Sequence, residues 1–303
     1  MQLFRPSSDI AEQSSDDIWT CVCQSVTDAV GASGVDPAAI AGIGFDATCS
    51  LVVLDRDDQP LSISATGDSS RNIIVWMDHR AVDQAHRINQ TKHRVLDYVG
   101  GTISPEMETP KLLWLKENMP DTYHNVGHFF DLTDFLTWRA TGASIVDPGT
   151  PRGHGLTHAA ASEMGLTPGT AVGAGLIDAH AGGVGSVGAA GPHDGAAARM
   201  AYVFGTSACT MSSSETAAFV PGVWGPYFSA MVPGLWLSEG GQSAAGEAIA
   251  HLVKCHPAYP AAQVAADKAG QDVLAYLVDK TAQKATPLSD AIGLAKQMPV
   301  VPE

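Results

Sequence analysis

The sequence contains no run of eighteen apolar residues, and residues 1–17 hold no apolar segment with a basic flank. From these absences we predict that the sequence contains no membrane span and no secretory signal, and we expect the chain to act in the cytoplasm. Basic residues are also scarce: 17 lysines and arginines stand against 32 aspartates and glutamates, which gives a net charge of −15. A surface of this charge repels phosphate backbones and anionic lipid, and nucleic acid and membranes are therefore excluded as expected partners.

Cysteine is sparse as well. The five cysteines are odd in number and scattered along the chain. Cys21 and Cys23 lie two positions apart within a helical pattern, so their side chains point in different directions. This distribution predicts reduced thiols rather than a disulfide framework or a zinc site.

What the sequence does contain predicts a folded α/β protein. With 303 residues, of which 45% are hydrophobic, the chain is long enough for two domains. The Gly/Ala-rich stretch 181–198 suggests a boundary, and we place the domains at residues 1–190 and 191–303. Apolar spacing predicts a helix from residue 14 that ends at Gly31, a buried strand over residues 171–177 and helical structure over residues 261–280.

The predicted strand 171–177 leads directly to Asp178, which small residues follow. A carboxylate at the end of a strand can lie in a pocket and accept a proton from a hydroxyl group. Alternatively, Asp178 only caps the next helix. The nearby His180 is more simply interpreted as a structural histidine.

Two further strand ends carry polar residues. Gly205, Thr206 and Ser207 follow a short apolar strand, where backbone N–H groups and hydroxyls can bind phosphate, although the same residues also form ordinary turns. Trp76, Asp78 and Arg80 suit a polyol, because indole stacks on a sugar face and charged groups bond hydroxyls. The alternative for this segment is a core tryptophan beside a surface Asp–Arg pair.

Taken together and in this order, these motifs resemble the FGGY carbohydrate kinases, and within them the ribulokinase-like branch. The similar stretches are residues 42–50, 76–80, 110–115, 128–131, 175–183, 204–207, 221–226 and 239–243. The resemblance implies two actin-like (ribonuclease H-like) domains around a cleft, with the sugar mainly on the first domain and ATP between the two. It further implies a ketopentose substrate, such as D- or L-ribulose, and is compatible with a homodimer.

The resemblance also assigns roles to individual residues. Asp178 matches the general base that takes a proton from the sugar's terminal hydroxyl as that hydroxyl attacks the γ-phosphate of ATP, with Mg²⁺ neutralising charge. Gly205 and Thr206 match a phosphate-binding turn that Ser207 completes. The expected sugar contacts are Ala47, Thr48, Trp76, Asp78, Arg80 and Glu239. No residue is assigned to a metal site.

The sequence departs from the family pattern at three places, so we expect both domains to be incomplete. An initial Asp-x-Gly-Thr strand, a lysine-bearing segment near residues 147–152 and an adenine-binding segment after residue 280 have no counterpart. Loss of that first strand predicts reduced stability, because its neighbours keep unpaired backbone groups.

Three functions therefore remain open. The first is a pentulose kinase, and the second is a catalytically inactive, truncated form that serves as a sugar-binding regulatory module. The third is a metal-dependent hydrolase built from Asp78, His79, Asp178 and His180, which the absence of a helical two-histidine spacing disfavours.

Overall fold

The computed structural model describes residues 1–142, 154–189, 195–205 and 207–284. The chain forms two compact units. The first unit comprises residues 1–199 and 212–238, and the second comprises residues 200–211 and 239–303. The boundary at residue 190, placed from composition alone, remains a proposal.

The main sheet of the first unit is built around β4 (Leu51–Asp55). Its strand order is β1-β5-β4-β6, and all three strand pairs are antiparallel. The other strands are β1 (Glu12–Gln13), β5 (Ile73–Ile74) and β6 (Val126–Asp131). The run Leu51-Val-Val-Leu54 is buried throughout, as expected for a strand that helices cover on both faces.

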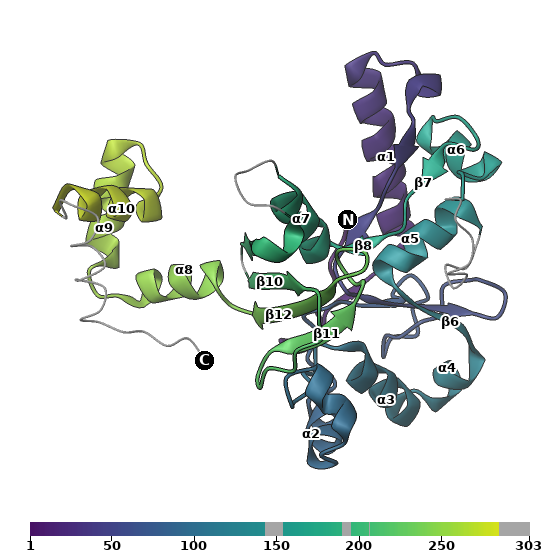
Figure 1. Ribbon diagram of the computed structural model, residues 1–303, viewed down its shortest axis with the longest axis horizontal. Helices are drawn as coiled ribbons and strands as arrows, with labels where there is room; N and C mark the ends of the chain where they lie inside the picture. Colours follow the sequence, from purple (N-terminus) through teal and green to yellow (C-terminus); the bar gives the residue numbers. More distant parts are fainter. Residues whose placement is uncertain (143–153, 190–194, 206, 285–303) are drawn as a thin grey trace. The chain divides into compact units, whose positions relative to one another are not determined.

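Side chains of β4 alternate between two hydrophobic cores, because successive residues of a strand point to opposite faces. Val52 and Leu54 pack with residues of α1, α5 and α6, whereas Leu51 and Val53 pack with residues of α3 and α4. Figure 1 shows these helices on either side of the sheet. They are α1 (Ser15–Ser33), α5 (Leu132–Thr141), α6 (His158–Met164), α3 (Glu108–Asn118) and α4 (Pro120–Asn125). The first unit is therefore a helix–sheet–helix sandwich.

Helix α1 begins where the sequence predicts but ends later. Ser14 is the N-cap, and its Oγ accepts a hydrogen bond from the N–H of Asp17 at 3.2 Å. The helix passes through Gly31 and stops at Gly34, whose φ of 67° lies in the left-handed region. The predicted end at Gly31 is wrong. Gly34 adopts the left-handed conformation that ends a helix, whereas Gly31 is tolerated within the helix interior.

Two short parallel strand pairs also belong to the first unit. β2 (Gly42–Ile43) pairs with β7 (Ala171–Val172), and β3 (Asp46–Ala47) pairs with β8 (Leu176–Ile177). The predicted strand 171–177 is thus interrupted at residues 173–175. A Cβ at Gly175 would lie 2.3 Å from Thr133 Oγ1, so glycine is needed where α5 approaches the chain.

The second sheet has the strand order β11-β12-β10-β9. Its strands are β9 (Met200–Phe204), β10 (Ala208–Ser214), β11 (Trp224–Phe228) and β12 (Trp236–Gln242). Helices α8 (Gly246–Cys255), α9 (Tyr259–Ala269) and α10 (Val273–Lys284) follow. The helical structure predicted over residues 261–280 is present but is divided, because the left-handed Gly270, with φ 65°, ends α9 and separates it from α10.

The remaining elements connect these layers. They are α2 (Val82–Gln90), α7 (Asp178–Gly188) and the 3₁₀ turns η1 (Pro37–Ala39), η2 (Arg94–Tyr98) and η3 (Ala196–Ala198). In the described part of the chain, no helix has both the length and the apolar character needed to cross a membrane.

Candidate active site

The parallel pairing of β3 with β8 places the predicted base beside predicted sugar contacts. Asp46 pairs with Leu176, and Ala47 pairs with Ile177. Both strands therefore end at the same edge, where Thr48 follows β3 and Asp178 follows β8. The carboxyl ends of parallel strands are the usual ligand-binding edge of an α/β sheet. Residues that are about 130 positions apart in the chain thus meet at this edge.

Asp178 begins helix α7 but does not cap it. The N-cap position belongs to Ile177, and Asp178 is the first helical residue. Its Oδ1 accepts a hydrogen bond from the N–H of Ala179 at 2.8 Å. The side chain is exposed, so its carboxylate is accessible to a substrate hydroxyl. The capping interpretation is therefore not supported, and a role as proton acceptor stays a prediction.

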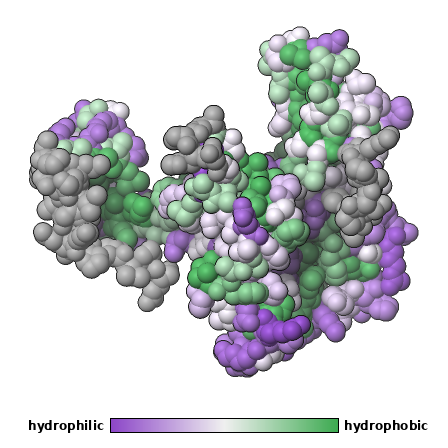
Figure 2. All heavy atoms as spheres, viewed as in Figure 1, coloured by the Kyte–Doolittle hydropathy of each residue, from purple (hydrophilic) through white to green (hydrophobic). Residues whose placement is uncertain are grey.

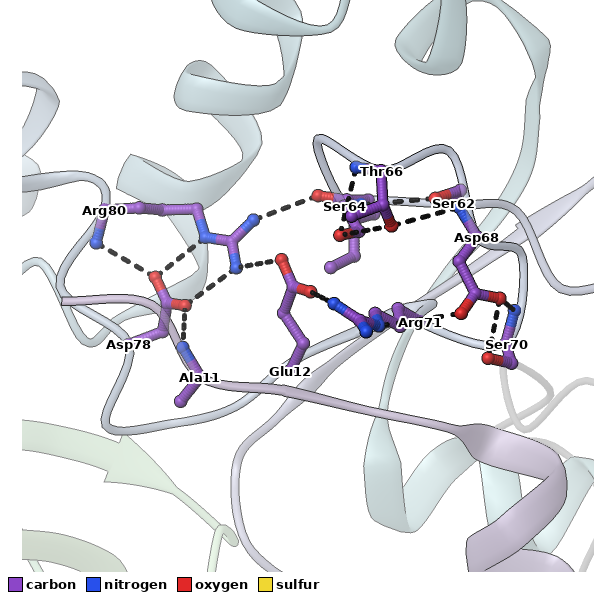
Figure 3. Close-up of polar contacts among 11 residues, drawn as sticks. Ala11, Glu12, Ser62, Ser64, Thr66, Asp68, Ser70, Arg71, Asp78 and Arg80 are labelled. Carbon is purple, nitrogen blue, oxygen red and sulfur yellow. Dashed lines mark hydrogen bonds and ion pairs between the residues drawn. The ribbon is translucent and has the colours of Figure 1, made fainter. Parts of the chain in front are cut away.

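Asp78 and Arg80 form part of a buried ion-pair network, shown in Figure 3. Arg80 Nε donates to Asp78 Oδ1 and Arg80 Nη2 donates to Asp78 Oδ2, both at 2.8 Å. Asp78 Oδ2 also accepts from the N–H of Ala11 at 2.7 Å. Arg80 donates further to Glu12 Oε1 and to the carbonyl of Ile63, each at 3.1 Å.

This network favours a structural role for both residues. The side chains of Asp78 and Arg80 are 0% and 3% exposed, so the pair lies in the interior. The alternative prediction of a surface Asp–Arg pair is therefore wrong. Arg80 can be buried because Glu12 of β1 supplies a second carboxylate to its guanidinium group. Sugar binding by Asp78 and Arg80 stays a prediction, and it would require them to leave these partners.

Trp76 lies two residues before this network and is half-buried. Its backbone N–H donates to Ser50 Oγ at 3.0 Å, and its carbonyl accepts from Lys111 Nζ at 3.3 Å. Sequence reasoning did not assign roles to Ser50 and Lys111. Both residues lie within stretches that resemble the family, and this resemblance could have indicated that they belong to the site.

A group of buried titratable side chains lies around Lys111. Burial raises the pKa of Glu108 to about 8 and that of Asp131 to about 6. Burial raises the pKa of Cys49 to about 12, whereas it lowers the pKa of Lys111. Both carboxylate oxygens of Glu108 are buried without a hydrogen-bond partner among the described residues. An ionised Glu108 should therefore destabilise the fold.

The contribution of Glu108 to stability should fall with rising pH between pH 6 and 8, and Glu108→Gln should remove that contribution. The folded pKa of Glu108, about 8, exceeds the ordinary value of 4.5, so the folded state holds a proton that the unfolded state has lost. Each pH unit in this window then costs up to about 1.4 kcal/mol. Asp131 titrates at about 6 and contributes mainly below the window. The midpoint of urea unfolding at pH 6, 7 and 8 measures the effect.

Glu117→Gln provides the control, because Glu117 lies on the same helix. Hydrogen bonds from Arg87 and Gln84 lower its pKa, so its stabilising contribution is complete above its ordinary pKa and constant from pH 6 to 8. This variant should keep the wild-type pH dependence. An unchanged pH slope in Glu108→Gln would show that Glu108 is not the group responsible.

The second unit contains the predicted phosphate turn. The N–H of Gly205 donates to the carbonyl of Ser207 at 2.8 Å, and the carbonyl of Gly205 accepts from the N–H of Gly246 at 3.0 Å. Gly246 is the first residue of α8, so the turn lies beside a helix N-terminus, where backbone N–H groups favour anions. Glu239 lies in β12 and is half-buried. Thr206 lies outside the described residues.

The second unit also has an open, mainly apolar pocket of about 280 Å³. It is lined by Phe204, Gln242, Ala244, Ala245, Ala248, Ile249 and Leu252. Phe204, Ile249 and Leu252 remain 54%, 47% and 44% exposed, and Figure 2 shows hydrophobic residues at the surface over α8.

The hydrolase alternative gains no support. In the described ranges, no three His, Cys, Asp or Glu side chains gather closely enough to hold a metal ion. Asp78 is engaged with Arg80 in the interior, and His79 pairs with Glu106 at 3.0 Å.

The fold of this chain is shared with solved sugar kinases. Xylulose kinase from Rhodospirillum rubrum is similar with a TM-score of 0.68 at 20% identity, over 88% of this chain and 60% of that one. Xylulose kinase from Lactobacillus acidophilus is similar with a TM-score of 0.67 at 17% identity, over 94% and 59% of the two chains. The predicted α/β class and the likeness to sugar kinases are confirmed.

The sequence itself matches the FGGY family of carbohydrate kinases, its N-terminal domain over residues 1–151 and its C-terminal domain over residues 200–299. The human FGGY carbohydrate kinase domain-containing protein is 46% identical, over 90% of this chain and 59% of that protein. A D-ribulokinase from Saccharomyces cerevisiae is 34% identical, over 96% of this chain and 51% of that protein. The chain belongs to the FGGY carbohydrate kinase family and spans between half and three fifths of these relatives.

Proposed function

We propose that this chain carries the sugar-binding side of an ATP-dependent pentulose kinase, with Asp178 as the general base. The observation that supports this most directly is the common edge of β3 and β8, where Ala47 and Thr48 lie beside Asp178. Relatives named for D-ribulose and solved structures named for xylulose support a five-carbon ketose as the substrate class.

In this reaction the side chains of the first unit would bind and orient the sugar. The indole of Trp76 would stack on a C–H face, and the backbone of Ala47 and the hydroxyl of Thr48 would bond sugar hydroxyls. Asp178 would accept the proton of the terminal hydroxyl as its oxygen attacks the γ-phosphate. Asp178 suits this task because its carboxylate is exposed, and its Oδ1 accepts a hydrogen bond from the adjacent N–H of Ala179 at 2.8 Å.

The second unit would contribute to phosphate binding through Gly205, Thr206 and Ser207, and Glu239 would accept hydrogen bonds from the sugar. The position of Gly205 beside the N-terminus of α8 fits an anionic ligand. Mg²⁺ would enter with ATP, because it is held mainly by phosphate oxygens and water with one or two carboxylates. A cage of protein ligands is not found among the described residues. A homodimer stays a prediction.

Pentulose-dependent formation of ADP tests this function. The chain is incubated with MgATP and D-ribulose, L-ribulose or D-xylulose, and ADP release is measured together with the sugar-dependent shift in melting temperature. We expect ADP with at least one pentulose. A melting-temperature shift without ADP would favour the sugar-binding regulatory module instead, because ligand binding alone stabilises a fold. If the chain gives neither ADP release nor a shift in melting temperature, both functions are refuted.

A further inference from the structure

Two segments that are proposed to contact the sugar share one buried hydroxyl group. Ser50 Oγ accepts a hydrogen bond from the backbone N–H of Trp76 at 3.0 Å and lies 3.0 Å from Thr48 Oγ1. Ser50 is fully buried, so water does not compete for these bonds. The N–H of Ser50 also donates to the carbonyl of Thr48 at 2.8 Å, which closes the turn after β3.

The backbone of Trp76 depends on side chains for its hydrogen bonds. β5 ends at Ile74, so Trp76 lies beyond the sheet ladder. Ser50 binds its N–H, and Lys111 Nζ binds its carbonyl at 3.3 Å and that of Val75 at 3.2 Å. Lys111 is 0% exposed, and burying an ammonium group is costly unless its protons are bonded. The position of the indole is therefore set by two buried residues from different elements.

We propose that Ser50 and Lys111 are positioning residues that hold Thr48 and Trp76 in a fixed relative position for the sugar. The proposal rests on the proposed function of this site. Ser50 couples the two segments directly, because one oxygen contacts both of them. Lys111, from α3, fixes the other side of the Trp76 peptide group.

Ser50 also restricts the hydrogen-bond direction available to Thr48. A hydroxyl has one proton to donate. If Ser50 donates to Thr48 Oγ1, the Thr48 proton is available to a sugar oxygen; if Thr48 donates to Ser50, Thr48 presents only lone pairs. Either hydroxyl can donate in this contact, so its direction sets whether Thr48 offers a proton or a lone pair to the substrate.

Ser50→Ala removes this coupling with the loss of a single oxygen. We expect the dissociation constant for the preferred pentulose to rise about tenfold, as the loss of one buried hydrogen bond would cause. The KM for ATP should change less than twofold, and kcat should fall much less than kcat/KM for the sugar. Isothermal titration calorimetry measures sugar affinity well below the melting temperature of each variant. Lys111→Met should weaken sugar binding in the same direction, provided that it folds.

Ser64→Ala is the matched control. Ser64 is 2% exposed and lies in the same unit. Among the described residues its side chain bonds within its own loop, where Oγ accepts from Thr66 Oγ1 at 3.1 Å. We expect this variant to lose stability without a change in sugar affinity. A double-mutant cycle of Ser50→Ala with Trp76→Phe should be non-additive, because Ser50 holds the backbone N–H of Trp76 and thereby positions the indole that Trp76→Phe removes.

Three outcomes decide the proposal. Weaker sugar binding in Ser50→Ala but not in Ser64→Ala, with non-additivity toward Trp76→Phe, supports it. Equal sugar affinity in both variants and the wild type overturns it while leaving the proposed function intact. If the wild-type chain binds none of the pentuloses, the proposed function fails and the positioning role fails with it.

Discussion

Replacing Arg80 by methionine should lower the free energy of unfolding by about 3–5 kcal/mol. Arg80 donates to both oxygens of Asp78 and to Glu12 Oε1, and these two carboxylates are 0% and 2% exposed. Methionine fills a similar volume but removes this cation from both carboxylates, so that Asp78 loses its ion pair and Glu12 keeps only the longer one with Arg71, at 3.8 Å, among the ion pairs of the described residues. Urea unfolding, followed by tryptophan fluorescence, measures the change.

The same network provides a test of the cause. Adding Asp78→Asn to Arg80→Met removes the buried charge of Asp78 that has lost its partner, so the double variant should be more stable than Arg80→Met alone. Arg87→Met is the control, because Arg87 pairs with Glu117 at an exposed position, where ion pairs contribute little. Equal losses in Arg80→Met and Arg87→Met would contradict the assignment of the large effect to buried charge.

The sequence predicted the layered α/β class because local patterns carry that information. An uninterrupted apolar run such as Leu51 to Leu54 indicates a strand buried on both faces, and the fourfold spacing from Ile18 indicates an amphipathic helix. Element ends were less predictable. Gly31 and Gly34 are equally suitable as helix stops by composition, and only the backbone conformation of Gly34 distinguishes them.

The candidate site was predictable where its residues follow strands and not where they meet across the fold. Asp178 and Thr48 each follow an apolar segment, so their strand-end positions could be inferred from the sequence. Glu12 could not be assigned, because its partners Arg71 and Arg80 are about 60 to 70 residues away, and no local spacing encodes that contact. Ser50 was missed for the same reason, since its function lies in a bond to Trp76 and not in its own surroundings.

Asp178→Asn should lower kcat for pentulose phosphorylation by about 10²–10⁴-fold, the usual contribution of a general base. Asparagine has almost the same shape, and its side-chain oxygen can still accept from the N–H of Ala179, as Asp178 Oδ1 does at 2.8 Å. It has no basic site for the proton of the sugar hydroxyl. The change therefore removes proton transfer and leaves the start of α7 in place. Single-turnover formation of ADP measures the loss, and calorimetry measures sugar affinity in the same variant.

Asp16→Asn separates this chemical role from a structural one. Asp16 is also an exposed aspartate in the first turn of a helix, so its replacement removes the same charge from a helix N-terminus. Asp16→Asn should leave kcat unchanged, and both variants should lose similarly little stability. If Asp178→Asn retains wild-type kcat, the base must be another group. If Asp178→Asn loses sugar affinity in parallel with kcat, Asp178 contributes to binding the sugar in the ground state. A loss confined to kcat, in contrast, identifies a group that acts in the transition state as the proton moves.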